Sequence, residues 1–246
     1  MCFSIKINFN PNDFCKKFNC ETNLNTDNQI ISTAFGPTKN DLVPVLAFKD
    51  NNLLVEEMNW SLTPSWSKDY PVKWGTYNAR MDRDKNGQLQ KVFDTPTFKN
   101  AFRQKQFCIV PINAAIESCY WGADGGNILS FSRIDGEDIY AAGLWDQWIN
   151  KSSGEIHYSF TLLTDGPYKY LFDHGHDRSI IGLNEEVIED FLTNNSRNHI
   201  QNFDFIRENR TKYSWSHQIE RPLKDGWQKR APKTSEIEQI KATVWS

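Results

Sequence analysis

Three apolar or alternating segments lie close together in the middle of the chain, at residues 128–134, 139–149 and 156–164. The short stretches between them are rich in Gly, Asp and Ser, residues that favour tight turns. Strands joined by such short turns pair antiparallel, because a parallel pair needs a much longer crossover. These segments are therefore predicted to form an antiparallel meander, and a fold for this chain has to be built around it.

Further strands and short helices surround the predicted meander. Strands are predicted at residues 43–48, 52–60 and 107–110, the last of them ending at Pro111. Short helices are expected at residues 13–18, 96–103, 168–172 and 184–193. The expected fold class is α+β, with one domain around a mostly antiparallel, barrel-like β-sheet and helices at its periphery.

Composition excludes several functional classes. No run approaches the roughly eighteen apolar residues of a membrane span, and the N-terminus lacks the apolar core of a signal peptide, so an intracellular protein without membrane association is expected. The five cysteines form no CxxC pair, and the five histidines lack a carboxylate or thiolate at ligand spacing. No metal and no cofactor are therefore predicted.

Charge is distributed unevenly, although the net charge is only −3. Residues 60–107 carry nine Lys and Arg against four Asp and Glu, whereas residues 108–200 carry five against fourteen. Residues 201–246 are basic again, with nine against six. A basic segment in an acidic protein fits one anion-binding face, and solvated lysines on loops are the alternative.

The chain begins with Met1-Cys2. The small side chain of Cys2 favours removal of Met1, which would leave a free α-amine beside the thiol. Reference pKa values are roughly 7.7–8.0 for the amine and roughly 8.5 for the thiol, so both groups react near neutral pH. Such a 1,2-aminothiol condenses with an aldehyde to an imine, and the thiolate then closes a thiazolidine ring. The alternative is that Cys2 belongs to a frayed terminus without a function.

Several polar residues stand in apolar or irregular segments, and their side chains are candidates for binding or catalysis. Arg80 can hold a phosphate, and Asn78 can hydrogen-bond a sugar or backbone. Burial would raise the pKa of Glu117 and suit it to acid–base work, while His176 can move a proton and Arg178 can hold a phosphate or carboxylate. Taken singly, each has a structural alternative: a turn former for Asn78, a surface ion pair for Glu117, and a capping or core residue for His176.

Large aromatic residues accompany the basic segment. Trp60 and Trp66 lie near the irregular stretch around Pro64, where they are candidate stacking platforms for unpaired bases. The alternative is that they cover an edge of the core.

Seven motifs in this order resemble the SRAP (SOS response-associated peptidase) family. They are Met1-Cys2, Trp60…Pro64-Ser-Trp66, Asn78-Ala-Arg80, Cys108-Ile-Val-Pro111 followed by Glu117, Ala142-Gly-Leu-Trp145, Phe160-Thr-Leu-Leu-Thr164 and His176-Asp-Arg178. The resemblance predicts a catalytic domain over residues 1–195 and a divergent basic, aromatic extension over 196–246 that packs on or near it.

The resemblance implies an enzyme that recognises abasic sites in single-stranded DNA as a monomer and forms a thiazolidine DNA–protein crosslink through Cys2. It implies self-removal of Met1, hence the word peptidase, and leaves an AP lyase activity open. Asn78 would position the N-terminus and substrate, while Glu117 and His176 would transfer protons. By the same resemblance Arg80 would contact DNA phosphate, and Trp66, Trp60 and Arg178 are the further residues expected to bind DNA from their own chemistry.

This chain departs from the family pattern beside its N-terminal cysteine. The family's Gly-Arg is here Phe3-Ser4, so a phosphate-binding arginine is missing, and Phe3 is a candidate to stack on a base instead. Two other functions therefore stay open. One is a binding module that holds single-stranded DNA without covalent chemistry, and the other is a thiol hydrolase with Cys2 as its N-terminal nucleophile.

Overall fold

The computed structural model describes residues 4–245 except 26–28, 39–40 and 83–87. Its larger sheet contains a closed ring of five strands, β4 (Leu42–Lys49), β5 (Asn52–Trp60), β7 (Phe107–Ile112), β10 (Ile139–Ile149) and β11 (Ile156–Asp165). Neighbours pair antiparallel, except that β11 and β5 pair parallel and close the ring. The predicted α+β fold with a mostly antiparallel, barrel-like sheet is confirmed.

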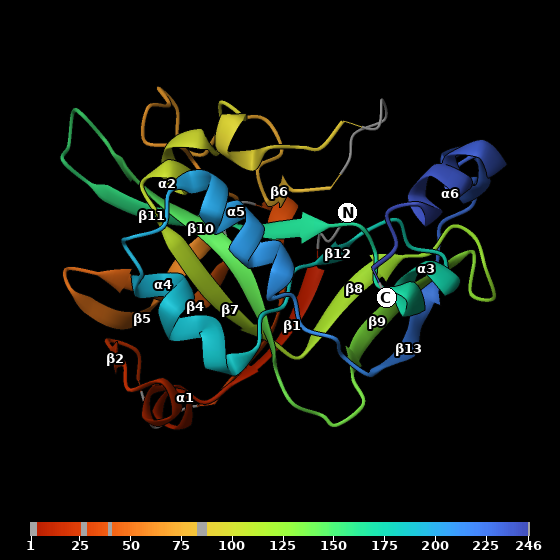
Figure 1. Cartoon of the computed structure of the whole chain (residues 1–246), viewed down its shortest axis with the longest axis horizontal. Helices are drawn as coiled ribbons and strands as arrows, with labels where there is room; N and C mark the ends of the chain where they lie inside the picture. The colour runs from red at the N-terminus through yellow and green to blue at the C-terminus, as the bar shows by residue number, and fades with distance from the viewer. Residues whose placement is uncertain (1–3, 26–28, 39–40, 83–87, 246) are drawn as a thin grey trace.

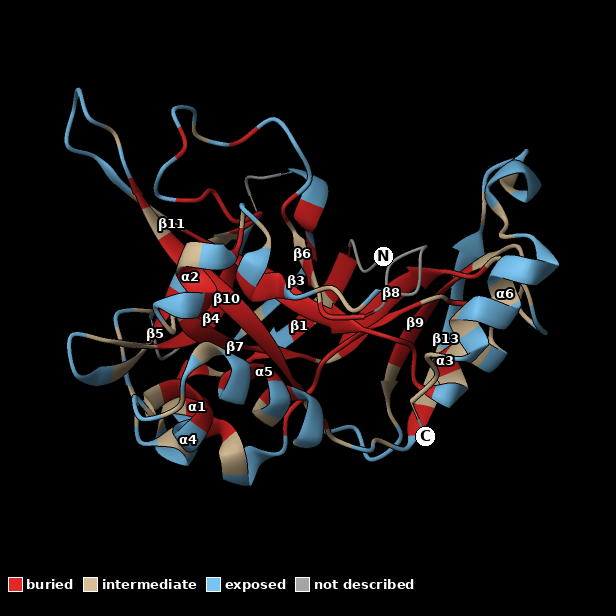
Figure 2. Ribbon diagram, turned by 45° about the horizontal axis from the view of Figure 1, so that its top comes forward, coloured by how far each residue is buried: buried red, intermediate tan, exposed pale blue. Residues whose placement is uncertain are grey.

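Short strands extend this barrel. β2 (Glu21–Thr22) pairs with β5, β6 (Asn78–Arg80) pairs parallel with β11, and β12 (Ser179–Ile180) pairs antiparallel with β11. The helices α1 (Pro11–Phe18), α2 (Lys99–Arg103), α4 (Ile188–Thr193) and α5 (His199–Glu208) lie around the barrel (Figure 1). Figure 2 shows that the barrel strands are mostly buried, and β5 has the largest share of exposed and intermediate residues among them.

A second sheet stands beside the barrel in the order β13-β9-β8-β1-β3. Its strands are β1 (Ser4–Phe9), β3 (Ile30–Phe35), β8 (Ala114–Ser118), β9 (Asn127–Arg133) and β13 (Trp215–Pro222). The helices α3 (Lys169–Asp173) and α6 (Thr234–Lys241) lie on this side of the molecule (Figure 1). No helix in the described ranges is long and apolar enough to cross a membrane.

The predicted meander is wrong for its first strand. β10 and β11 form the expected hairpin, but β9 pairs with β8 and β13 in the second sheet. The connection at residues 134–138 therefore carries the chain from one sheet to the other. Pro111 also does not end its strand, since β7 continues to Ile112 and pairs there with β10. At Pro111 the strand has no pairing with β4, which reaches only residues 108 and 109.

The C-terminal residues are part of this architecture. β13 pairs with β9 from Trp215 to Pro222, with an irregularity between Ile219 and Arg221, and forms an edge of the second sheet. Near the end of the chain, the Trp245 N–H donates to the Pro167 carbonyl, and the Lys169 N–H donates to the Trp245 carbonyl. These contacts join residues 196–245 closely to the rest, and the division at residue 195 stays a prediction.

Gly143 is needed where three strands of the barrel meet. It lies on β10 between Cys108 of β7 and Leu162 of β11, and a Cβ there would stand 2.6 Å from the Thr161 carbonyl oxygen and 2.9 Å from the Cys108 Sγ. The absence of a side chain at Gly143 therefore permits the backbone of Thr161 to approach closely. Gly143→Ala is therefore expected to lower the free energy of unfolding by about 3 kcal/mol, because the carbonyl cannot move without breaking the ladder.

Urea unfolding followed by circular dichroism measures this loss. Gly136→Asn is the matched control, because Gly136 has a φ of +77° and nothing within 4 Å of its missing Cβ. Asn tolerates that backbone conformation, so the control is expected to change stability by less than about 1 kcal/mol. Equal losses of unfolding free energy in the two variants would show that the close contact at Gly143 is not the cause of the loss.

Candidate active site

Glu117 is buried in the second sheet near the barrel. It lies on β8, pairs with Leu129 of β9, and is 1% exposed. The preceding residue, Ile116, pairs with Ser4 at the start of β1. The first described residue of the chain thus lies beside the strand that carries Glu117. The sequence-based alternative of a surface ion pair at Glu117 is excluded by its burial.

His176 faces Glu117 and is 2% exposed. Its Nδ1 lies 2.9 Å from the Ser118 carbonyl oxygen, and because a carbonyl only accepts hydrogen bonds, Nδ1 must carry a proton. Burial lowers the pKa of His176 to about 3, so the ring is neutral and Nε2 is an acceptor. Nε2 lies 3.2 Å from Glu117 Oε2. This contact becomes a hydrogen bond when the Glu117 carboxyl is protonated and donates to Nε2, and in that state the pair holds a transferable proton.

A row of alternating charges runs from this pair toward the barrel. Asp177 Oδ1 lies 3.7 Å from His176 Nε2, and the Arg178 Nη2 donates to Asp177 Oδ2 at 3.0 Å. Beyond it, Asp82 Oδ2 lies 3.8 Å from the Arg178 Nε, and Arg80 binds Asp82 through Nε and Nη2 at 2.9 and 2.7 Å. The two arginines predicted to bind DNA therefore meet at one buried carboxylate, and sequence analysis did not assign Asp82 or Asp177 a role.

β6 positions Asn78 and Arg80. This short strand pairs parallel with β11, Asn78 opposite Leu162 and Arg80 opposite Thr164. Ala79 between them is fully buried, so the flanking side chains share the other face of the strand. The Arg80 side chain is 41% exposed, whereas Arg178 is 7% exposed. Arg80 is thus the more accessible of the two to a phosphate.

A cavity of about 440 Å³ opens beside His176. Its walls include Tyr77, Ser118, Tyr120, Trp121, His176, Asp177, Arg178 and, from the C-terminal part, Arg230. Hollows of about 570 and 470 Å³ lie elsewhere, and none of the predicted catalytic residues lines them. The smaller cavity is therefore the candidate site because His176 lines it, not because of its volume. Sequence analysis missed Tyr77, Tyr120 and Trp121 as site residues, because no local pattern separates aromatic wall residues from core residues.

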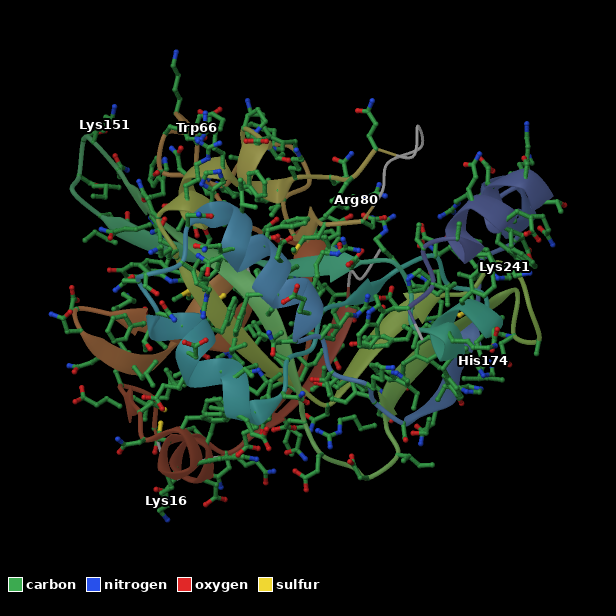
Figure 3. All side chains as sticks on the ribbon, viewed as in Figure 1. Lys16, Trp66, Arg80, Lys151, His174 and Lys241 are labelled. Atoms are coloured by element: carbon green, nitrogen blue, oxygen red, sulfur yellow. The ribbon has the colours of Figure 1, made fainter. Side chains whose placement is uncertain are left out.

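The two predicted tryptophan platforms have different surroundings. Trp60 is completely buried, its ring stacks on Phe160 at 6.2 Å, and its indole N–H donates to the Tyr77 carbonyl. The prediction that Trp60 stacks on DNA bases is wrong, because no base can reach this ring. Trp66 is 50% exposed and stacks on Trp74, itself 44% exposed, with ring centroids 6.3 Å apart. Trp66 and Arg80 both lie in the upper half of the view in Figure 3, and Trp66 stays a candidate for base stacking.

Two predicted residues, Cys2 and Phe3, lie outside the described residues. Their roles stay predictions.

Several histidines do have carboxylate partners, so the prediction that the histidines lack them is wrong. His174 Nδ1 lies 2.5 Å from Asp124 Oδ2, and His157 Nε2 lies 3.2 Å from Glu155 Oε1. In the first pair the residues are 50 positions apart, so only the tertiary fold brings them together.

Known proteins resemble this chain in sequence and in fold. The sequence model of a family described as SOS response associated peptidase (SRAP) matches residues 1–222. A crystal structure of a protein from Bacteroides thetaiotaomicron shares 20% identity with a TM-score of 0.69 and covers 97% of this chain and 99% of its own. A protein from Bordetella bronchiseptica shares 19% identity with a TM-score of 0.65, covering 91% and 100%. No curated protein matches the chain.

Proposed function

The chain belongs to the SOS response-associated peptidase family, and on that premise we propose that it recognises abasic sites in single-stranded DNA and binds them covalently. In this proposal Cys2, freed of Met1 by self-processing, reacts with the aldehyde of the ring-opened deoxyribose. The product is a thiazolidine that links the protein to DNA.

The contact between Glu117 and His176 is the observation that carries this proposal. A carboxyl and an imidazole lie 3.2 Å apart, both almost completely buried, and the imidazole lines an open cavity. A module that only holds DNA has no use for such a pair, and burying a carboxyl without function is unfavourable. Condensation of an amine with an aldehyde needs a group that gives and takes a proton at the same place.

Each step of the proposed reaction balances with these groups. The Cys2 amine adds to the C1′ aldehyde to give a carbinolamine, whose hydroxyl takes a proton from Glu117 and leaves as water, so that a protonated imine forms. The Cys2 thiol then passes its proton back to the Glu117 carboxylate, and the thiolate adds to the imine carbon, which closes the five-membered ring and leaves the nitrogen neutral with its N–H. His176 neighbours the Glu117 carboxyl and assists opening of the sugar ring.

Chain connectivity supports a role for Cys2 at this site. Two peptide links join Cys2 to Ser4, so their Cα atoms can be at most about 7 Å apart. Ser4 pairs with Ile116, the residue before Glu117. The N-terminal residue is thus tethered within a short distance of the strand that holds the proposed proton donor.

Intact-mass spectrometry tests the proposal directly. The purified protein is measured before and after incubation with an abasic-site oligonucleotide. We expect a mass that lacks Met1, and then a heat-stable adduct equal to protein plus oligonucleotide minus one water. A processed protein that binds the oligonucleotide without an adduct would make it a noncovalent binding module, and turnover of an amide substrate would favour a thiol hydrolase.

Arg80 is proposed to contact DNA phosphate. Its guanidinium is partly exposed beside Asp82, and one lost phosphate contact on a single strand lowers the slope of log K against log salt by roughly 0.7. Arg80→Ala is therefore expected to weaken binding of undamaged single-stranded DNA about three- to ten-fold and to reduce that slope by about this amount. Fluorescence anisotropy at several salt concentrations measures both values.

Arg103→Ala is the matched control for Arg80. Arg103 is also 41% exposed and also paired with an aspartate, but its partner is Asp94, whereas the partner of Arg80 is Asp82, which also neighbours Arg178. Its replacement is expected to leave affinity and slope unchanged. Equal effects of both variants would mean that Arg80 contributes only general positive charge.

The proposal also covers the location of the protein, its oligomeric state and its other contacts with DNA. We propose that the protein works as an intracellular monomer without a membrane partner, and that Trp66 and Phe3 stack on bases beside the abasic site. Met1 removal and any AP lyase activity belong to the same proposal. Residues 196–246 would add basic contacts, and Arg230 in the cavity wall supports this for one of them.

A further inference from the structure

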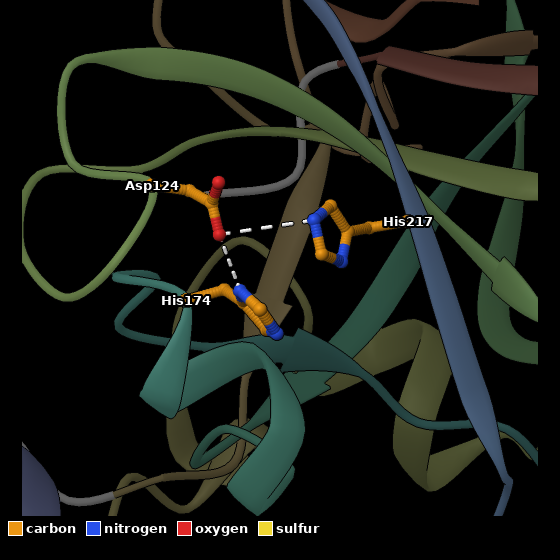
Figure 4. Close-up of side chains that lie close together, drawn as sticks. All are labelled: Asp124, His174 and His217. Carbon is orange, nitrogen blue, oxygen red and sulfur yellow. Dashed lines mark hydrogen bonds and ion pairs between the residues drawn. The ribbon is translucent and has the colours of Figure 1, made fainter.

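Three side chains from separate segments converge outside the cavity of the candidate active site. Asp124 lies in the turn between β8 and β9, His174 directly follows α3, and His217 lies on β13 (Figure 4). Each offers one ligand atom, and the three atoms lie within 4.8 Å of one another. None of the three lines the cavity beside His176. We propose that Asp124, His174 and His217 form a zinc-binding site.

The distances suit a tetrahedral ion after a small adjustment. Bonds of about 2.0–2.2 Å place tetrahedral ligand atoms about 3.4 Å apart. Asp124 Oδ2 lies 3.7 Å from His217 Nε2, close to that value, and 2.5 Å from His174 Nδ1. The ion would replace the hydrogen-bonded proton between Asp124 and His174, and that pair would open by about 1 Å.

Tyr170 prepares one ligand for this role. Its hydroxyl lies 2.9 Å from His217 Nδ1, the nitrogen that does not face Asp124. A hydrogen bond at Nδ1 holds the ring in place, and with the proton on that nitrogen the lone pair of Nε2 points at the site. Metal-bound histidines characteristically have such a partner on their second nitrogen. The rings of His174 and His217 also pack together, with centroids 4.2 Å apart, which limits their rotation.

The chemistry of the donors favours Zn²⁺ over Mg²⁺ and Ca²⁺. Two imidazole nitrogens and one carboxylate oxygen suit Zn²⁺, whereas Mg²⁺ and Ca²⁺ need sites built from oxygen. The ligand side chains are 17–23% exposed, so water can take the fourth position and an ion can enter from solvent. The charge of Asp124 offsets part of the charge of the ion.

Metal binding would stiffen one wall of the candidate active site. The loop that carries Asp124 already bonds the segment that carries His174, through Tyr120 N–H to the Gly175 carbonyl and Trp121 Nε1 to the Phe172 carbonyl. Tyr120 and Trp121 line the cavity, and His174 is two residues before His176. An ion would therefore join these two wall segments to β13. The zinc site stands on its own geometry and does not depend on the proposed function.

Calorimetric titration of zinc chloride into the chelator-treated full chain tests the site. We expect one equivalent to bind, His217→Gln to weaken binding at least about 100-fold, and Tyr170→Phe to weaken it about 10-fold. His199→Gln is the matched control, because His199 is another half-buried histidine, packed on Phe93 and outside the cluster. It should leave zinc affinity unchanged, and zinc should raise the unfolding temperature of the wild type but not of His217→Gln.

Thiols can also bind zinc: Cys2 together with its amine, or Cys15 and Cys20, whose Sγ atoms lie 3.2 Å apart. Replacing zinc with Co²⁺ distinguishes the proposed site from binding to these thiols. The Co²⁺ protein should show visible d–d bands without a sulfur-to-cobalt charge-transfer band, and Cys2→Ser should not change them. A strong charge-transfer band, equal affinities for His217→Gln and His199→Gln, or no binding by the wild type would each overturn the proposal. The wild-type spectrum decides the question even if a ligand variant does not fold.

Discussion

Replacing Cys2 with serine is expected to abolish the heat-stable adduct with an abasic-site oligonucleotide completely. The thiazolidine ring contains the sulfur of Cys2, and a hydroxyl in its place is a far weaker nucleophile near neutral pH. Affinity for undamaged single-stranded DNA should stay within about three-fold, because the substitution removes no charge. Denaturing electrophoresis after heating measures the adduct, and fluorescence anisotropy measures the affinity.

Borohydride reduction makes the Cys2→Ser experiment sharper. The variant keeps its α-amine once Met1 is removed, so it should still form an imine with the aldehyde. Reduction converts that imine into a stable amine, and a trapped adduct in the variant would show that the terminus still reaches the abasic site. Cys15→Ser, the same substitution at a half-buried internal thiol, should crosslink like the wild type. A heat-stable adduct from unreduced Cys2→Ser would rule out the thiazolidine.

The local hydrophobic pattern of the sequence predicted most strands, but it did not predict which strands pair. The hairpin of β10 and β11 was predictable because two apolar runs flank a short polar turn. β9 has the same local character, yet it pairs with β8 before it and with β13 about eighty residues later. Strand pairing across such separations depends on the packing of both sheets, which alternation within one segment does not encode. The closure of the barrel by β5 and β11 depends on the tertiary fold in the same way.

The candidate site was predictable as a set of residues but not as an arrangement. Glu117 and His176 stood out because polar side chains followed apolar strands, while their contact and the row through Asp82 required the fold. Trp60 was misjudged because its position at the end of β5 suggested exposure, whereas pairing of β5 with β11 buries it against Phe160. The ligands Asp124, His174 and His217 come from three elements and leave no spacing to recognise.

The Glu117→Gln variant is expected to form the crosslink at least about 100-fold more slowly at neutral pH. Gln keeps the size of the side chain and can still hydrogen-bond His176, but it cannot transfer a proton, and a positioned acid–base group contributes about 10²–10⁴-fold to a rate. Affinity for single-stranded DNA should stay within about three-fold, since Glu117 is only 1% exposed. Single-turnover crosslinking measures the rate.

Two further variants separate proton transfer from a structural role of Glu117. Glu56→Gln replaces another buried glutamate, 8% exposed on β5 and paired with Lys49, and should crosslink at the wild-type rate. Glu117→Ala should be slow but partly restored by added formate, because the small acid can occupy the vacated volume and supply the proton. A structural defect would not respond to formate. A wild-type rate in Glu117→Gln would remove proton transfer from this residue and, because the contact between Glu117 and His176 carries the proposed function, would remove its main support as well.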